Sequence, residues 1–249
     1  MLSSPLIHAS SIPDPSAEIY NFLEFIELEI TERTQHLGQS PWTGNSMRRI
    51  FITDFDGTLC RQDFYQLVVS ELLPGSVPNY WQQYLNQELT HFEVLQRYFA
   101  EIRSPLHEVE KLLERMELEP QLQGYVSQLR ESGWELAIAS AGCKWYIDKL
   151  LQKITPPLVV HANPGEFIEG QGLRMSLPYG LQFFSPITGI DKAAMVKAAL
   201  AVEGPKVVAY AGDGLTDIIP ALARHLDSKQ QRYHPFDRWG EIAEYLLRQ

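Results

Sequence analysis

Asp54 and Asp56 are the first residues of the chain whose types and spacing suit chemistry. They end the segment 48–56, RRIFITDFD, which is apolar enough to form a buried strand, and a single phenylalanine separates them. Burying two carboxylates at the end of a strand is costly unless a positive partner compensates their charge. By itself the string DFDG is typical of a turn or of a calcium-binding loop. The pair therefore predicts a positively charged partner without identifying it.

Three further places carry polar residues where a predicted strand ends or where a helix follows one. Ligands of open α/β sheets bind at the carboxyl ends of the strands. Taken singly, each of these residues has a commoner structural role, as a helix cap or as a solvated surface lysine. Their order along the chain, after the two aspartates, indicates one shared site instead. The residues are Ser140 with Ala141 and Gly142, then Lys192, then Asp213 and Asp217.

The elements that must position these residues form an α/β pattern. Strands rich in Ile, Val and Ala alternate with helices, which predicts a Rossmann-like core with a mainly parallel sheet. The predicted strands are 49–54, 134–140, 158–163 and 205–213, with a hairpin turned at EGQG, and the predicted core helices are 144–154, 191–204 and 238–249. Residues 61–131 are almost entirely helical in pattern, too long a block for a single crossover. We therefore expect a helical cap at 61–124, inserted into a core formed by 48–60 and 125–249.

The two ends of the chain are less regular in pattern. Residues 16–37 have apolar side chains at helical spacing, which predicts that 1–47 is an N-terminal helical extension. Such a helix either packs on the core or serves the interface of a homodimer. Near the other end, residues 228–242, SKQQRYHPFDRWGEI, show little β-pattern. A further edge strand is not indicated there.

Composition limits the classes of partner. The formal net charge is −10, which disfavours a nucleic-acid surface because phosphate backbones need clustered Lys and Arg. A small phosphorylated substrate is compatible with this charge if a local cationic pocket or a metal offsets it. The two cysteines, Cys60 and Cys143, are typical of free thiols in a reducing compartment. No apolar run is long enough to span a bilayer and no signal peptide is recognisable, so the expectation is a cytoplasmic protein without membrane partners.

Four strings together resemble the phosphatases of the haloacid dehalogenase superfamily. They are FITDFDGTL, IASAG, GIDK and AYAGDGLTD, in the order of the family's four motifs, and the resemblance covers about residues 48–220. The inserted helices resemble the C1-type cap of the phosphoserine phosphatase branch. The fourth motif, GDGLTD, has Thr216 where phosphoserine phosphatases usually have Asn. In this it resembles the branch that includes the 2-hydroxy-3-keto-5-methylthiopentenyl-1-phosphate phosphatases of methionine salvage.

The resemblance implies a role for each motif. Asp54 would attack phosphorus and form an aspartyl-phosphate, and Asp56 would act as the general acid and then the general base. Ser140, the backbone N–H groups of Ala141 and Gly142 at a helix N-terminus, and Lys192 would hold the phosphoryl oxygens.

A magnesium ion is the implied answer to the buried charge of the aspartates. Asp54, the backbone carbonyl of Asp56 and Asp213 would bind Mg²⁺. Asp217 would orient a metal-bound water or Lys192, and Thr58 would position Asp56 or the turn that carries it. In the cap, Asp63 and Arg97 are candidates for substrate contacts, the alternative being that both are solvated helix residues.

The function expected from this reading is Mg²⁺-dependent hydrolysis of a small phosphomonoester metabolite. A phosphomutase of the same superfamily is one alternative, in which the aspartyl-phosphate returns its phosphoryl group to a sugar. The other is a catalytically silent module that uses the fold to bind a partner. The core motifs contact only the phosphoryl group, so the choice of substrate falls to the cap.

Overall fold

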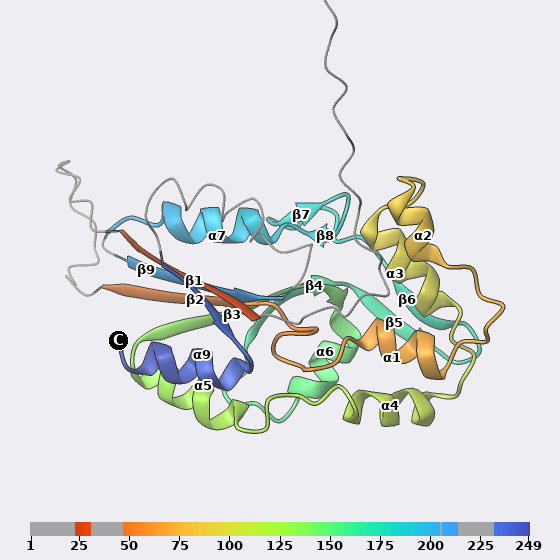
Figure 1. Ribbon diagram of the computed structural model, residues 1–249, viewed down its shortest axis with the longest axis horizontal. Helices are drawn as coiled ribbons and strands as arrows, with labels where there is room; N and C mark the ends of the chain where they lie inside the picture. The colour runs from red at the N-terminus through yellow and green to blue at the C-terminus, as the bar shows by residue number, and fades with distance from the viewer. Residues whose placement is uncertain (1–22, 31–46, 205, 214–231) are drawn as a thin grey trace, which may run out of the picture.

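A six-stranded sheet, with helices on both of its faces, organises the chain (Figure 1). The computed structural model describes residues 23–30, 47–204, 206–213 and 232–249. The strands of this sheet are, in chain order, β1 (Leu23–Ile30), β2 (Arg48–Thr53), β3 (Trp134–Cys143), β4 (Val159–Asn163), β9 (Lys206–Gly212) and β10 (Arg232–Phe236). Two small antiparallel sheets pair β5 (Gly165–Ile168) with β6 (Gly172–Met175) and β7 (Phe184–Ser185) with β8 (Gly189–Ile190).

The centre of the large sheet is parallel, as the sequence predicts. Its strand order is β10-β1-β9-β2-β3-β4, and β9, β2, β3 and β4 pair in parallel. Thr53, the last residue of β2, pairs with Ile138 on β3 and with Ala211 on β9. The carboxyl ends of these three strands therefore lie at one edge of the sheet, and the predicted motifs follow from that edge.

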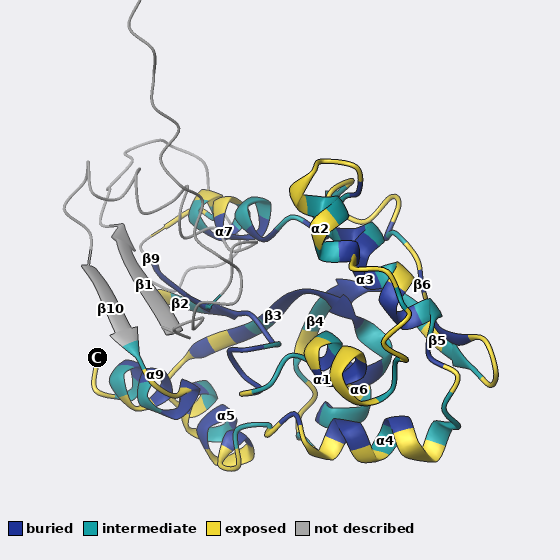
Figure 2. Cartoon of the chain, turned by 45° about the vertical axis from the view of Figure 1, so that its right-hand side comes forward, coloured by how far each residue is buried: buried dark blue, intermediate teal, exposed yellow. Residues whose placement is uncertain are grey.

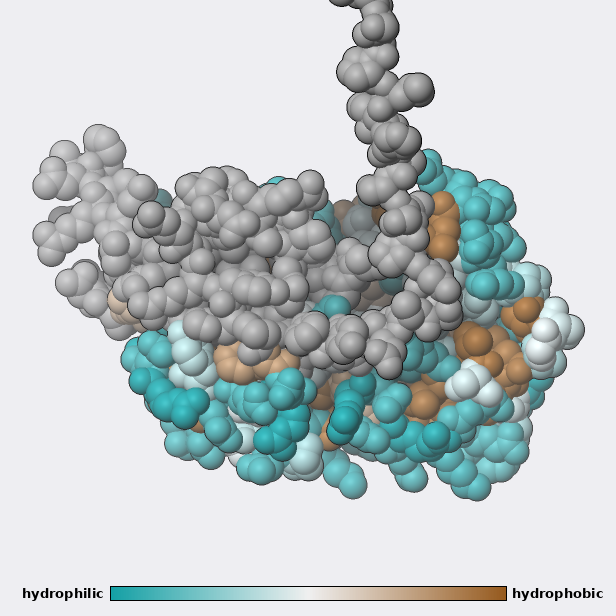
Figure 3. All heavy atoms as spheres, viewed as in Figure 1, coloured by the Kyte–Doolittle hydropathy of each residue, from teal (hydrophilic) through white to brown (hydrophobic). Residues whose placement is uncertain are grey.

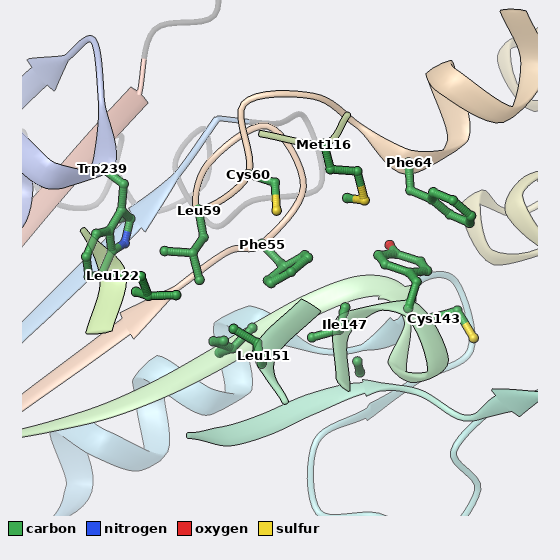
Figure 4. Close-up of a cluster of buried hydrophobic side chains, with 14 of the residues drawn as sticks. Phe55, Leu59, Cys60, Phe64, Met116, Leu122, Cys143, Ile147, Leu151 and Trp239 are labelled. Atoms are coloured by element: carbon green, nitrogen blue, oxygen red, sulfur yellow. The ribbon is translucent and has the colours of Figure 1, made fainter. Parts of the chain in front are cut away.

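The helices cover the sheet according to the alternation of its side chains. The core helices are α5 (Leu122–Glu131), α6 (Lys144–Leu151), α7 (Lys192–Ala201) and α9 (Trp239–Leu247). Neighbouring side chains of a strand point to opposite faces, so Phe51 packs in the cluster that includes α5 and α9, and Ile52 packs with α7. The rings of Phe51 and Trp239 are stacked with centroids 5.7 Å apart. Figure 4 shows Trp239 of α9 beside Leu59 and Leu122 in this core. Buried residues line the strands and the inner faces of the helices (Figure 2).

Four helices lie together at one end of the sheet (Figure 1). They are α1 (Phe64–Glu71), α2 (Tyr80–Leu85), α3 (His91–Ala100) and α4 (Leu106–Glu114). We call them the helical insertion. An antiparallel bridge between Cys60 and Leu118 joins the two chain segments at its base. The next helix, α5, packs on β3 and α9 and so belongs with the sheet. The part of the surface that is described in Figure 3 is mainly hydrophilic, with hydrophobic patches on the side of the insertion.

Two hydrogen bonds to backbone carbonyls attach the insertion to the core. The N–H of Phe92, in the first turn of α3, donates to the carbonyl of Ile187 at 2.9 Å. The Gln96 side chain donates to the carbonyl of Met175 at 2.8 Å. The insertion is therefore attached to the segment that leads into α7 as well as to the hairpin β5–β6.

One prediction near the N-terminus is wrong, and the open question of an edge strand near the C-terminus is answered. Residues 23–30 form strand β1 where a helix was predicted, and β1 pairs antiparallel with both β9 and β10. An edge strand, β10, is present within the segment that showed little β-pattern. The remaining predicted residues of the N-terminal extension lie outside the described part of the chain. Within the described residues, no helix is long and apolar enough to cross a membrane.

Candidate active site

Asp54 and Lys192 form a buried ion pair at the carboxyl edge of the sheet. Lys192 Nζ lies 2.7 Å from Asp54 Oδ2, and the two residues are 3% and 6% exposed respectively. The backbone N–H of Phe55 donates to the other oxygen, Oδ1, at 2.7 Å. Lys192 is the first residue of α7, and the side chain of Asp191 caps that helix by accepting from the N–H of Ala194. Lys192 is thus a protein partner for the buried charge that the sequence predicted.

The backbone around Asp54 is held from two sides. Its N–H donates to the carbonyl of Ala211 on β9 at 2.8 Å, which extends the parallel ladder by one bond. The indole N–H of Trp239 donates to Thr53 Oγ1 at 3.0 Å, and the Thr53 hydroxyl donates to the Asp54 carbonyl at 2.9 Å. All of these groups are buried, where hydrogen bonds are costly to leave unmade. Helix α9 therefore helps to fix the aspartate although it lies on one face of the sheet.

The Asp56 carboxylate accepts three hydrogen bonds. The N–H of Phe64 donates to Oδ1 at 3.1 Å, and the hydroxyls of Tyr146 and Ser140 donate to Oδ2 at 2.6 and 3.4 Å. Burial raises the pKa of Asp56 above its usual value, although these donors and the charge of Lys192 act in the opposite direction. A carboxyl group with a raised pKa is suited to donating a proton near neutral pH.

Ser140, Ala141 and Gly142 lie in an irregular end of β3. The strand continues to Cys143 with a shift of register, and α6 begins only at Lys144. The three residues therefore precede the N-cap of α6, Cys143, and lead directly into that helix. The N–H of Gly142 donates to Ser140 Oγ at 2.9 Å, which gives the loop a turn of its own.

Asn163 joins this loop to the segment that leads to Lys192. The side chain is fully buried, and its amide donates to the carbonyls of Ala141 at 2.7 Å and Thr188 at 3.0 Å. Gly189, with φ at +81°, lies against the same amide, and a side chain there would collide with it. The loop after β3 and the start of α7 are therefore fixed relative to each other.

Asp213 lies against the loop that follows Asp54. Its Oδ1 accepts from Thr58 Oγ1 at 3.1 Å, and Thr58 is itself buried. Gly57 has φ at +70°, and a Cβ at that position would collide with the Asp213 carboxylate. This close approach requires glycine and brings the carboxylate beside the backbone of residue 57. Asp217 lies outside the described residues.

The oxygen donors at this edge suit a magnesium ion. The donors are the carboxylates of Asp54 and Asp213 and the backbone carbonyl of Asp56. Asp213 lies against Gly57 and Thr58, which brings its carboxylate next to the loop that carries Asp54 and Asp56. Among the described residues no group of three or more His, Cys, Asp or Glu side chains is arranged to hold a metal. Mg²⁺ commonly takes only one or two protein carboxylates and keeps several waters. The donor set therefore fits Mg²⁺ better than an ion that needs an all-protein cage.

The two predicted substrate residues of the insertion differ in position. Asp63 precedes α1 and accepts from the side chain of Gln66 at 2.7 Å, and its charge contributes to raising the pKa of Tyr146. Arg97 is exposed on α3, where its guanidinium lies over the ring of Tyr80, 5.7 Å from the centroid. The contacts of Arg97 favour the alternative of a solvated helix residue.

Aromatic residues of the insertion contact one another. Trp81 packs against the rings of Tyr65 and Tyr84, with centroids 5.2 and 5.6 Å apart. Burial and the negative charges of Asp63 and Asp213 raise the pKa of Tyr65 to about 12. Tyr65 follows Phe64, whose N–H donates to Asp56, whereas Trp81 and Tyr84 contribute mainly to the packing of the insertion itself.

Sequence reasoning missed two residues that contact the predicted site, Tyr146 and Asn163. Tyr146 lies in the first turn of α6, directly after the Ser140 loop, and a hydroxyl at that place is a signal that was available. Asn163 ends β4 and offered a similar signal, a polar side chain at the carboxyl end of a buried strand.

Comparison with known proteins identifies relatives of this arrangement. The model of the family described as haloacid dehalogenase-like hydrolase matches residues 51–222, well over half of the chain. This match confirms the resemblance inferred from the four motifs and the prediction of a hydrolase.

Curated relatives and solved structures match at low identity. The 2-hydroxy-3-keto-5-methylthiopentenyl-1-phosphate phosphatases of Bacillus cereus and Bacillus mycoides are each 23% identical over 207 residues, covering 78% of this chain and 93% of theirs. A phosphoserine phosphatase with a phospho-aspartyl intermediate analogue gives a TM-score of 0.42 at 18% identity, over 53% of this chain and 65% of that one. A substrate-bound phosphoserine phosphatase gives 0.44 at 16% identity, over 63% and 71%.

Proposed function

Because the chain belongs to the haloacid dehalogenase-like hydrolase family, we propose that it is a Mg²⁺-dependent phosphatase that works through an aspartyl-phosphate. The observation that carries the proposal is the buried ion pair of Asp54 with Lys192, beside Asp56, at the carboxyl edge of the sheet. A nucleophilic carboxylate, a fixed cation and a carboxyl group of raised pKa are the groups that phosphoryl transfer requires.

In the first step, Asp54 attacks phosphorus. The bond between Asp54 Oδ and phosphorus forms while the bond from phosphorus to the leaving oxygen breaks. Asp56 gives its proton to that oxygen, so the substrate leaves as an alcohol. Lys192 and the Ser140 loop hold the phosphoryl oxygens, and in a buried site such fixed charges act strongly.

In the second step, water hydrolyses the aspartyl-phosphate. Water attacks phosphorus and gives a proton to the Asp56 carboxylate, which restores the acid. Inorganic phosphate leaves, and Asp54 returns to its ionised form beside Lys192. Asp54, the Asp56 carbonyl and Asp213 would hold Mg²⁺, which when bound neutralises charge on the phosphoryl oxygens.

The substrate that we propose is a small phosphomonoester. The curated relatives are named as phosphatases of 2-hydroxy-3-keto-5-methylthiopentenyl-1-phosphate, which supports a metabolite of that size. The helical insertion would act as the cap that selects the substrate. Asp63 and Tyr65, the neighbours of the Asp56 donor Phe64, are its candidate contacts.

Phosphate release from p-nitrophenyl phosphate tests this proposal. The wild-type protein should release phosphate with Mg²⁺ and lose that activity in EDTA. Asp54→Asn, a nearly isosteric change, should abolish release while the far-ultraviolet circular dichroism stays that of the wild type. Arg61→Gln serves as the matched control, because the Arg61 side chain is exposed and pairs with the surface residue Glu117.

Wild-type turnover in Asp54→Asn would remove Asp54 from the nucleophile's role. Transfer of the phosphoryl group to a sugar without free phosphate would indicate a mutase instead. A folded wild-type protein without activity on any phosphomonoester of a metabolite panel would contradict the enzymatic proposal as a whole.

A further inference from the structure

Tyr146 makes the shortest of the hydrogen bonds to the Asp56 carboxylate. Its hydroxyl lies 2.6 Å from Oδ2, against 3.1 Å for the Phe64 N–H on Oδ1 and 3.4 Å for the Ser140 hydroxyl. A separation of 2.5–2.7 Å is typical of a hydroxyl that donates to an ionised carboxylate, and such bonds are stronger than neutral ones. Among its described donors, Tyr146 therefore restrains the Asp56 carboxylate most strongly.

The ring of Tyr146 has little freedom to move. The residue is 1% exposed, and its ring centroid lies 4.5 Å from that of Phe64 and 6.3 Å from those of Phe55 and Phe99. Phe55 belongs to the loop that carries both aspartates, whereas Phe64 and Phe99 belong to α1 and α3 of the helical insertion. Figure 4 shows Phe55 and Phe64 in this part of the core. The hydroxyl is thus held by packing from both parts of the molecule.

Gly142 leaves the space in which this hydrogen bond forms. A Cβ at residue 142 would collide with the Tyr146 hydroxyl and would lie 2.8 Å from Asp56 Oδ2. The loop that carries Ser140 therefore passes directly beside the contact. The absence of a side chain at residue 142 is a requirement of the contact between Tyr146 and Asp56.

We propose that Tyr146 is a positioning residue for the general acid Asp56, an inference that rests on the proposed phosphatase function. The tyrosine keeps its own proton and donates a hydrogen bond to Oδ2, which restricts rotation of the carboxyl group. Asp56 is thereby held in the orientation from which its proton reaches the leaving oxygen and from which it later accepts one from water. Small errors in the placement of a reacting group cost large factors in rate.

The change that tests this inference is Tyr146→Phe, which removes the hydroxyl and keeps the ring among Phe55, Phe64 and Phe99. The two substrates are glycerol 2-phosphate, whose alkoxide needs a proton to leave, and p-nitrophenyl phosphate, whose phenolate leaves without one. We expect kcat/KM for glycerol 2-phosphate to fall about 10- to 100-fold. We expect kcat/KM for p-nitrophenyl phosphate to fall less than about threefold. This constant includes only the steps up to formation of the aspartyl-phosphate, and in those steps the nitrophenolate needs no proton from Asp56.

Tyr125→Phe is the matched control. Tyr125 is also a buried tyrosine, and its hydroxyl donates to Glu244 at 3.0 Å on the face covered by α5 and α9, away from the site. This variant should keep the wild-type kcat/KM for both substrates. A second test introduces Tyr146→Phe into an Asp56→Asn protein. There the substitution should not lower kcat/KM for p-nitrophenyl phosphate any further, because the carboxyl group that Tyr146 positions is already absent.

Equal losses for the two substrates in Tyr146→Phe would overturn the inference, as would the absence of any loss. An additional loss in the Asp56→Asn background would show that Tyr146 acts independently of Asp56. These results are distinct from failure of the proposed function, in which the wild-type protein itself releases no phosphate from either substrate.

Discussion

The ion pair of Lys192 with Asp54 is unlike the other ion pairs of the described residues. Its side chains are 3% and 8% exposed, whereas a pair such as Lys144–Asp148 lies at the surface. Removing one partner of a buried pair leaves a charge without compensation, which costs about 3–5 kcal/mol. Exposed pairs contribute about 0–1 kcal/mol. We therefore expect Lys192 to contribute to the stability of the fold as well as to the proposed binding of the phosphoryl group.

We predict that Lys192→Met lowers the free energy of unfolding by about 3–5 kcal/mol, measured by urea denaturation in EDTA. The double variant Asp54→Asn with Lys192→Met should recover part of this loss, because neither charge remains in the buried site. Lys144→Met is the surface control and should cost less than about 1 kcal/mol. If Lys192→Met were no more destabilising than Lys144→Met, Lys192 would not compensate the buried charge of Asp54.

The positions of the motif residues could be predicted from the sequence, but the residues that contact them could not. Parallel strands bring the residues at their carboxyl ends, and those that begin the following helices, to one edge of the sheet. These positions hold Asp54, Asp56, Ser140, Lys192 and Asp213. The contacts of Tyr146 and Asn163 depend on how α6 and β4 pack against that edge. The sequence offered their polar side chains near a strand end and a helix start as a signal. Their partners could not be predicted, because such packing is set by side chains far apart along the chain.

Asn163 and the segment that leads to α7 connect the loop of Ser140–Gly142 with the buried Lys192. Asn163 bridges the carbonyls of Ala141 and Thr188, and Gly189 leaves room for its amide. A side chain at Gly189 would have to displace that amide and would also be strained by the positive φ. This single glycine therefore controls the spacing of two parts of the site.

We predict that Gly189→Ala lowers both stability and kcat/KM for p-nitrophenyl phosphate. Gly170→Ala is the matched control, because Gly170 also has a positive φ, +73°, but no atom lies within 4 Å of the added Cβ. The control should cost about 1–2 kcal/mol of unfolding free energy from backbone strain alone and should leave kcat/KM unchanged. Gly189→Ala should cost more than the control. Equal effects of the two substitutions would mean that the Asn163 bridge is irrelevant to the site.

Strands β1 and β10 show where local pattern misleads. The apolar residues of 23–30 fit helical spacing as well as they fit a strand, and the choice is made by pairing with β9 and β10. In β10, Pro235 weakened the strand pattern of the sequence. Among the described strands, β10 lies at the edge of the sheet, and edge strands tolerate a proline because one of their sides does not need to bond a neighbour.

The two parts of the molecule meet at the site. The helical insertion contacts the core through Phe92 and Gln96, and its Phe64 backbone donates to Asp56. Movement of the insertion would therefore act directly on Asp56, the residue that we propose as the general acid. The alternation of strands and helices predicted the core and the insertion as separate units, but the contacts between them required the structure.

The two thiols of the molecule are poor competitors for the nucleophile's role. Cys60 and Cys143 are both buried and free. Burial raises the pKa of Cys60 well above its usual value and that of Cys143 to about 12. At neutral pH almost none of either thiol is a thiolate, the form that attacks phosphorus. Asp54, whose Oδ2 lies 2.7 Å from Lys192 Nζ, is therefore a better candidate for the nucleophile than either thiol.

The most direct test is a rapid-mixing experiment on Asp56→Asn with p-nitrophenyl phosphate and Mg²⁺. Without a base to activate water, the aspartyl-phosphate should accumulate, and a burst of about one p-nitrophenolate per protein molecule should precede slow turnover. Acid-quenched protein should carry a phosphoryl group on Asp54 that hydroxylamine removes. If the wild-type protein turns over but this variant shows no burst, or if the phosphoryl group is found on any other residue, Asp54 is not the nucleophile.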